Sequence, residues 1–126
     1  MGGLAFLWRK ALGSSITDKN FDDPRIAGLI VSTADVQFLL INVYMPTAGP
    51  ENRDLYQDYL GKISAIVSEC GLSHVIIPGD WNARNGRIEF EWVRDFCSDA
   101  DLVIDYLLTH SRILVIPTRP FPGSIT

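Results

Sequence analysis

The chain has 126 residues, of which 47% are hydrophobic and 21% charged, with a formal net charge of −4 and a pI of about 5.0. This composition excludes a disordered protein, and the length limits the chain to one domain. The acidic balance also excludes a global positive field for holding nucleic acid, so any such contact must be local.

The N-terminal half predicts mostly β-structure. An almost unbroken apolar run, residues 3–8, predicts a strand buried on both faces, and the polar residues 13–25 predict a loop with room for one short strand. Residues 25–32 and 36–45 are rich in β-formers and are separated by Thr33-Ala34-Asp35, which predicts a hairpin.

An amphipathic helix is predicted over residues 51–70. Pro50 suits its first turn, Gly71 suits its end, and apolar residues recur at spacings of three and four, namely Leu55, Tyr59, Ile63, Ile66, Val67 and Cys70. Residues 74–79 then predict a buried strand that stops at Pro78-Gly79. The order strand, helix, strand makes the two strands parallel, so Tyr44 and Asp80 should emerge at the same edge of the sheet.

The C-terminal third predicts one more helix and two short strands. Residues 89–100 are helical with Phe90, Val93, Phe96 and Cys97 facing inward, residues 102–108 and 113–116 are apolar runs, and residues 117–126 are a proline-rich irregular tail. We find no internal repeat and no linker, which indicates a single α/β domain. Cys70 and Cys97 lack metal-ligand spacing and are too few for a disulfide framework, so we expect reduced, buried thiols.

No apolar run approaches the length of a membrane span, and the N-terminal charges follow the apolar residues, the reverse of a secretory signal. We therefore expect an intracellular protein, nuclear or cytoplasmic, with no membrane association.

The chemistry is concentrated in Gly79-Asp80-Trp81-Asn82. The Asp80 carboxylate can act as a general base or metal ligand, and the Asn82 carboxamide can both donate and accept hydrogen bonds. Asp and Asn are also common in ordinary turns, so this tetrapeptide alone leaves both interpretations open. Tyr44, taken alone, is equally consistent with a half-buried strand aromatic; at the same edge as Asp80, its hydroxyl would reach the same substrate oxygen.

These motifs in order, Asn-Val-Tyr-Met-Pro at 42–46 and Gly-Asp-Trp-Asn-Ala at 79–83, resemble the endonuclease/exonuclease/phosphatase superfamily. The residues after Asp80 and the run 96–104 are most similar to the endonuclease domains of non-LTR (LINE-like) retrotransposons. The likeness extends over about residues 3–108 and implies a four-layered α/β sandwich, of which residues 1–126 would form a single partial domain.

The resemblance implies hydrolysis of a phosphodiester or phosphomonoester with Mg²⁺ as cofactor and DNA as partner. Asp80 would orient and deprotonate the attacking water and would be the candidate metal ligand here, Asn82 would hold that water and a phosphate oxygen, and Tyr44 would hydrogen-bond the phosphate in the transition state.

The sequence also departs from the family pattern. The family's metal-binding Glu lies upstream of the Gly-Gly strand and its catalytic His near the end of the domain, and this chain has neither. We therefore expect a piece of the domain with little or no activity. Asp105 resembles the family Asp that orients this His, although its spacing from Asp80 is short enough for the match to be accidental.

Two further residues have open interpretations. Trp81 would either stack on a base or pack beneath the loop that carries Asp80, and Arg84, with Arg87, would either contact phosphate or lie on a solvated face. Two alternatives to the endonuclease hypothesis remain: a phosphomonoesterase of the same superfamily, and a noncatalytic remnant or binding module.

Overall fold

The structure, a computed structural model, describes residues 4–107 and 112–118, without the side chains of residues 105–107 and 112. Its elements in chain order are the 3₁₀ helix η1 (Lys10–Ser15), β1 (Ile16–Asp23), β2 (Ile26–Ser32), β3 (Gln37–Tyr44), the 3₁₀ helix η2 (Pro50–Asn52), α1 (Arg53–Cys70), β4 (Val75–Asp80), α2 (Ile88–Asp99), β5 (Leu102–Leu107) and β6 (Arg112–Pro117). The predicted hairpin, both predicted helices and the last three predicted strands are confirmed at nearly the expected bounds.

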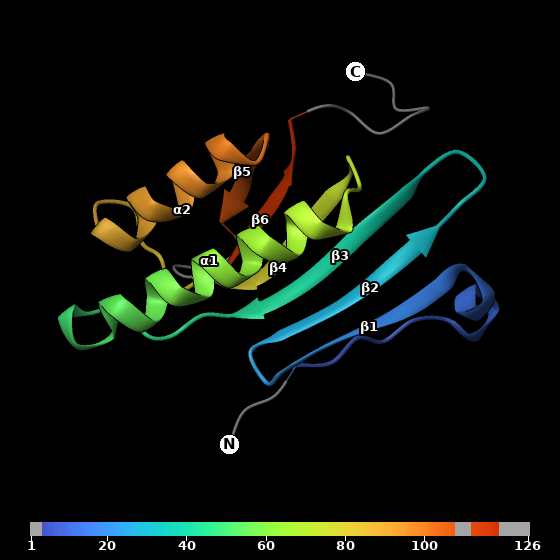
Figure 1. Cartoon of the computed structure of the whole chain (residues 1–126), viewed down its shortest axis with the longest axis horizontal. Coiled ribbons are helices and arrows are strands. Elements are labelled where there is room, and N and C mark those ends of the chain that lie inside the picture. Colours follow the sequence, from blue (N-terminus) through green and yellow to red (C-terminus); the bar gives the residue numbers. More distant parts are fainter. Residues whose placement is uncertain (1–3, 108–111, 119–126) are drawn as a thin grey trace.

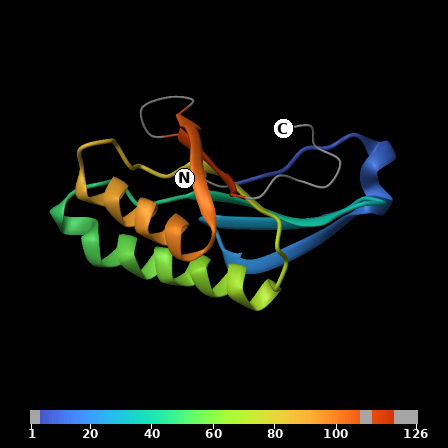
Figure 2. The same cartoon turned by 90° about the horizontal axis from the view of Figure 1, so that it is seen from above.

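The strands form one mixed sheet in the order β1-β2-β3-β4-β6-β5. Both α-helices lie on the same face of this sheet, with α1 alongside α2 (Figure 1, Figure 2). The α/β fold class is confirmed, and the described residues supply one sheet and one helical layer. β2 pairs antiparallel with β3, β3 parallel with β4, and β4 antiparallel with β6. The predicted parallel connection through α1 is therefore present.

The hydrophobic core lies between the sheet and the two helices. Successive strand residues point to opposite faces, and on β3 the fully buried set is Leu39, Ile41 and Val43. These residues share one cluster with side chains of both helices, among them Tyr56, Leu60, Ile63, Val93 and Phe96. The alternation places Tyr44, the next residue on the other face, away from the helices.

The inward face of α1 was predicted with an error of about one residue. Leu55 is 44% exposed, whereas the neighbouring Tyr56 is completely buried. The helix has two adjacent rows of apolar residues, one that contains Leu55 and one that contains Tyr56. Each row has a spacing of three and four, so the spacing alone does not show which row faces the sheet. The row of Tyr56, Leu60 and Ile63 faces the sheet, and Tyr59 lies at its margin.

The prediction was wrong at the N-terminus, where residues 4–9 form no strand and are followed by η1. Leu7 is fully exposed and Trp8 is 43% exposed, so this apolar run is not core. The edge position beside β2 is taken instead by β1, within the segment predicted to be mainly loop. β1 is an edge strand with mostly exposed side chains, which explains why its sequence is polar.

Both cysteines are free thiols, Cys97 buried and Cys70 only half-buried. Burial raises the pKa of Cys97 to about 12. Among the helices of the described ranges, none has the length and apolar character needed to cross a membrane.

Candidate functional site

Tyr44 and Asp80 lie side by side at one edge of the sheet. They are the last residues of β3 and β4, and they are direct partners in the parallel register. Partnered residues on neighbouring strands point to the same face, so the phenol and the carboxylate are presented together. Tyr44 is 38% exposed although Val43 and Met45 on either side of it are buried, which leaves its ring accessible.

The chain after each strand is fixed by Asn82. Met45 N–H donates to the Asp80 carbonyl at 2.9 Å, and Asn82 Nδ2 donates to the Met45 carbonyl at 2.8 Å. Asn82 itself has a φ of 46°, a left-handed conformation that Asn tolerates better than most residues, and its N–H donates to Asp80 Oδ1 at 3.1 Å. These bonds fix the carboxamide, and within the described part of the chain its Oδ1 and second N–H have no other hydrogen-bond partner.

Gly79 makes the close approach of the two strands possible. Its φ is 141°, and a Cβ built on it would lie 2.1 Å from the Val43 carbonyl oxygen. A side chain would therefore push β4 away from β3 immediately before Asp80. The Pro-Gly pair that predicted the end of this strand also sets the distance between the strands at the site.

Trp81 packs beneath the loop that carries Asp80, which is the second of the two interpretations given in the sequence analysis. Its side chain is completely buried, Nε1 donates to the Ile77 carbonyl at 3.3 Å, and the ring lies 6.0 Å from that of Phe96. The Tyr56 hydroxyl donates to the Trp81 carbonyl. A ring with no exposed surface cannot stack on a base, so Trp81 supports Asp80 and Asn82 from within the core.

Burial, followed by the nearby charges of Glu89 and Asp80, raises the pKa of Tyr56 far above its usual range. This hydroxyl therefore stays protonated and serves as a fixed hydrogen-bond donor under the site.

Arg25 is a site residue that the sequence analysis missed. It lies in the turn between β1 and β2, where its Nη1 donates to the Tyr44 carbonyl at 3.0 Å and its guanidinium carbon lies 5.1 Å from the centre of the Tyr44 ring. That separation is within the range of a cation–π contact. The hairpin register could have found it, because pairing Ser32 with Gln37 places Arg25 beside Tyr44.

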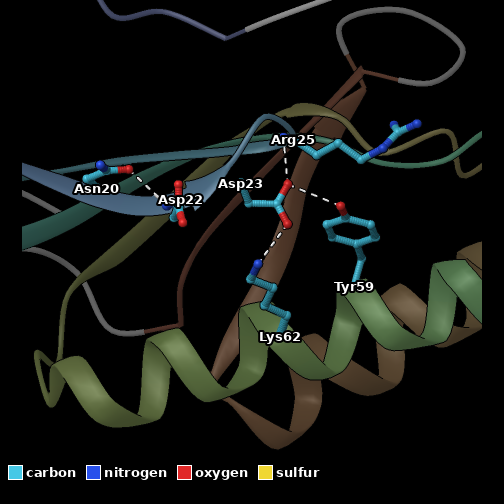
Figure 3. Close-up of polar contacts among 6 residues, drawn as sticks. All are labelled: Asn20, Asp22, Asp23, Arg25, Tyr59 and Lys62. Carbon is cyan, nitrogen blue, oxygen red and sulfur yellow. Dashed lines mark hydrogen bonds and ion pairs between the residues drawn. The ribbon is translucent and has the colours of Figure 1, made fainter.

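The turn that carries Arg25 is attached to α1 through Asp23 (Figure 3). The Asp23 carboxylate accepts the Arg25 backbone N–H at 2.8 Å, the Tyr59 hydroxyl at 3.1 Å and Lys62 Nζ at 2.7 Å. Burial acts to raise the pKa of Asp23, but hydrogen bonds from Lys62, Arg25 and Tyr59 outweigh it and lower this pKa below its usual value. The arrangement holds Arg25, and hence Tyr44, at a fixed position relative to the helix.

Asp105 lies apart from Tyr44 and Asp80. The β5–β6 register shifts between Ile104 and Tyr106, so Asp105 is the extra residue of a bulge in β5. Its backbone lies level with the middle of β4, and β6 separates the two strands, which is about 10 Å at ordinary strand spacing. Its side chain is outside the described residues, and its orienting role stays a prediction. Arg84 is exposed in the loop after Asn82.

A magnesium ion would need oxygen ligands at this edge. Mg²⁺ is usually held by one or two carboxylates together with water and substrate phosphate oxygens. Among the side chains that the structure describes, no three of His, Cys, Asp or Glu gather in a way that could hold a metal, and Asp80 is the carboxylate beside Tyr44. These side chains therefore offer one carboxylate ligand at this edge, Asp80.

Comparison with known proteins identifies the fold. No family model and no curated protein matches the sequence. Among solved structures, the chain is similar to the endonuclease domain of TRAS1, a telomere-specific non-LTR retrotransposon, with a TM-score of 0.67 and 14% identity over 79% of this chain and 52% of that one.

Two further structures are similar. A β-hairpin deletion mutant of beta toxin from Staphylococcus aureus has a TM-score of 0.60 and 12% identity over 82% of this chain and 48% of that one. The 3′ phosphatase NExo from Neisseria, bound to a product DNA hairpin, has a TM-score of 0.54 and 13% identity over 81% and 57%.

All three structures belong to the endonuclease/exonuclease/phosphatase superfamily, and the chain has their fold. The fold implied by the Tyr44 and Asp80 motifs is therefore confirmed. The chain spans about half the length of the structures it matches.

Proposed function

We propose that the edge formed by Tyr44, Asp80 and Asn82 binds a phosphodiester of DNA and belongs to the hydrolytic site of an endonuclease of the non-LTR retrotransposon type. The observation that carries the proposal is the direct pairing of Tyr44 with Asp80, with Asn82 fixed between the two strand ends. The motif resemblance and the likeness to the TRAS1 endonuclease domain support this choice of substrate.

Each side chain has a chemical role in this proposal. The Asp80 carboxylate accepts a proton from water as the water oxygen bonds to phosphorus, and Asn82 Oδ1 orients that water by accepting its other hydrogen. The Tyr44 hydroxyl donates to a non-bridging phosphate oxygen, where negative charge increases in the transition state. The bond to the leaving oxygen then breaks, solvent supplies the proton for that oxygen, and the products are a phosphomonoester and an alcohol.

Arg25 is a positioning residue in this scheme. Its guanidinium holds both the carbonyl and the ring of Tyr44, which fixes the direction of the phenol. Removing its charge should therefore affect phosphate binding through Tyr44.

The first test is binding, which does not depend on turnover. Titration of the isotopically labelled chain with a thymidine dinucleotide should shift the amide signals of Tyr44, Asp80 and Asn82 in heteronuclear NMR spectra. Tyr44→Phe keeps the ring and should weaken this binding, whereas Leu55→Ala, on the exposed side of α1, should not. Shifts confined to other surfaces would contradict the proposal.

The second test is hydrolysis of supercoiled plasmid in the presence of Mg²⁺. Because the described residues provide a single carboxylate at the edge, we expect nicking far below that of a complete site, and we expect Asp80→Ala to abolish it. Nicking that survives Asp80→Ala would refute the role of this carboxylate. Faster release of phosphate from soluble monoesters than nicking of plasmid would favour a phosphomonoesterase, and binding without turnover on any substrate would favour a noncatalytic binding module.

A further inference from the structure

A concave surface lies beside the site, on the loops that follow β3 and β4. It is a cavity of 330 Å³ lined by residues 47–50, Arg53, Asn82, Arg84 and 87–89. Asn82 belongs to both surfaces, because its side chain is bonded to the Met45 carbonyl and also lines this cavity. A ligand bound at Tyr44 and Asp80 would therefore meet this cavity at Asn82.

The lining of this cavity is mainly cationic. It contains three guanidinium groups, Arg53, Arg84 and Arg87, and one carboxylate, Glu89. Three of the eleven basic residues of an acidic chain are thus gathered in one cavity. Sequence totals hide such a concentration, and the field inside the cavity is opposite in sign to that of the whole chain.

Glu89 leaves most of this positive charge uncompensated. Its side chain is only 3% exposed, Oε2 accepts the Gly49 backbone N–H at 3.2 Å, and it lies 3.9 Å from Arg53 Nε. The carboxylate therefore attaches the loop after β3 to α2 and forms one wall of the cavity. Arg84 and Arg87 are exposed, and their guanidinium groups have no hydrogen bond or ion pair within the described part of the chain.

Both long helices begin at this cavity. α1 starts at Arg53 and α2 at Ile88, and neither first turn has a side-chain cap. Uncapped N–H groups and the helix dipole add partial positive charge at such ends. Together with the three arginines, they favour an anionic ligand in the cavity.

We propose that this cavity binds a backbone phosphate next to the one held at Tyr44 and Asp80, so that the substrate is a polynucleotide and not a small phosphoester. The inference rests on the proposed function, because it places the neighbouring phosphate relative to the bond that is cleaved. A guanidinium group pairs with a phosphate through two parallel N–H···O bonds, which suits Arg84 and Arg87 to this role. A small phosphodiester has no second phosphate to place there.

The test is equilibrium binding of a fluorescein-labelled single-stranded oligonucleotide, measured by fluorescence anisotropy over a range of salt concentrations. For the double variant Arg84→Gln/Arg87→Gln we expect binding about tenfold weaker or more per arginine. The slope of log affinity against log salt should become shallower by about 0.7 for each phosphate that the variant no longer neutralises.

The matched control is Arg94→Gln on α2, which removes one exposed arginine that pairs with Glu91 and does not line this cavity. Urea unfolding of all three proteins checks the fold, which the exposed side chains of Arg84 and Arg87 should leave unchanged. If the double variant binds the oligonucleotide as tightly as Arg94→Gln does, or if the unaltered chain does not bind it, the proposal is overturned.

Hydrolysis of bis(p-nitrophenyl) phosphate separates this proposal from the proposed function. The two substrates compared are bis(p-nitrophenyl) phosphate and the oligonucleotide. If the unaltered chain hydrolyses neither of them but the double variant loses oligonucleotide binding, the phosphate-binding role of the cavity is supported and the hydrolytic function fails. If the chain hydrolyses both substrates and the double variant is unchanged on both, the hydrolytic function is supported and the cavity proposal is overturned. If the double variant loses hydrolysis of the oligonucleotide but keeps that of bis(p-nitrophenyl) phosphate, the hydrolytic function and the cavity proposal are both supported.

Discussion

Replacing Gly79 with alanine should separate the two strands that carry the site. The added Cβ would lie 2.1 Å from the Val43 carbonyl oxygen and 2.8 Å from the Val43 nitrogen, both of which are backbone atoms in the paired strand. At a φ of 141°, alanine also adopts a strained conformation. Conformational strain costs about 1–3 kcal/mol and overpacking a similar amount, so we expect a loss of about 2–6 kcal/mol in the free energy of unfolding.

A loss of this size is a large part of the stability of an ordinary domain, about 5–15 kcal/mol. Urea denaturation followed by far-UV circular dichroism would measure it. Gly61→Ala is the matched control, because Gly61 lies within α1 with no atom within 4 Å of its added Cβ. Alanine there should stabilise the chain by about 0.5–1 kcal/mol. If Gly79→Ala unfolds at the same urea concentration as the unaltered chain, the inferred close approach of β3 and β4 is wrong.

Three further predictions concern the support of the site. Tyr56→Phe should lower the free energy of unfolding by about 1–2 kcal/mol in urea denaturation, because the buried Trp81 carbonyl loses its donor; an unchanged midpoint would show that this bond contributes nothing. The Asp23 carboxylate has a pKa below its usual value of 3.8, so it stabilises the folded chain above that value, and this contribution should disappear as the pH falls through the lowered pKa. Thermal unfolding between neutral and acidic pH should show a smaller decrease for Asp23→Asn than for the unaltered chain, and parallel curves would contradict the assignment. Cys97 should react with a thiol reagent at mildly alkaline pH only after unfolding, because burial raises its pKa to about 12 and blocks access, whereas the half-buried Cys70 should react in the folded chain; equal rates in folded protein would refute this.

The sequence was sufficient to predict the sheet segment that carries the site. The pattern of a strand, an amphipathic helix and a second strand predicted that β3 and β4 are parallel, and this order alone placed Tyr44 and Asp80 at one edge. The prediction succeeded because two neighbouring strands joined through a helix run parallel whatever their exact ends. An error of one or two residues in the predicted ends of β3, α1 or β4 therefore does not affect it.

Interactions that depend on side-chain reach were not predictable in this way. The β2–β3 register places Arg25 beside Tyr44, but it does not reveal that the guanidinium group bonds to the Tyr44 carbonyl and lies over its ring. Glu89 is buried where it accepts the backbone N–H of Gly49, far away in the sequence. The apolar residues 3–8 were predicted to form a strand because hydrophobicity is the main signal for a buried strand, yet residues 4–8, the part that the structure describes, are not in a strand. β1 extends over most of a polar segment for which one short strand was predicted, because its backbone pairs with β2 while its side chains stay mostly exposed.

The contact between Arg25 and Tyr44 has a consequence for how this chain tolerates insertions. Surface turns usually accept extra residues at little cost, and the turn between β1 and β2 has the appearance of such a place. Here, however, Arg25 is held from both sides of that turn: the β2–β3 register places it beside Tyr44, and Asp23 accepts its backbone N–H. A single residue added after Asp23 would leave that register intact while it separates Arg25 from Asp23, and with it from Tyr59 and Lys62 on α1, so an outwardly harmless loop carries a functional length constraint.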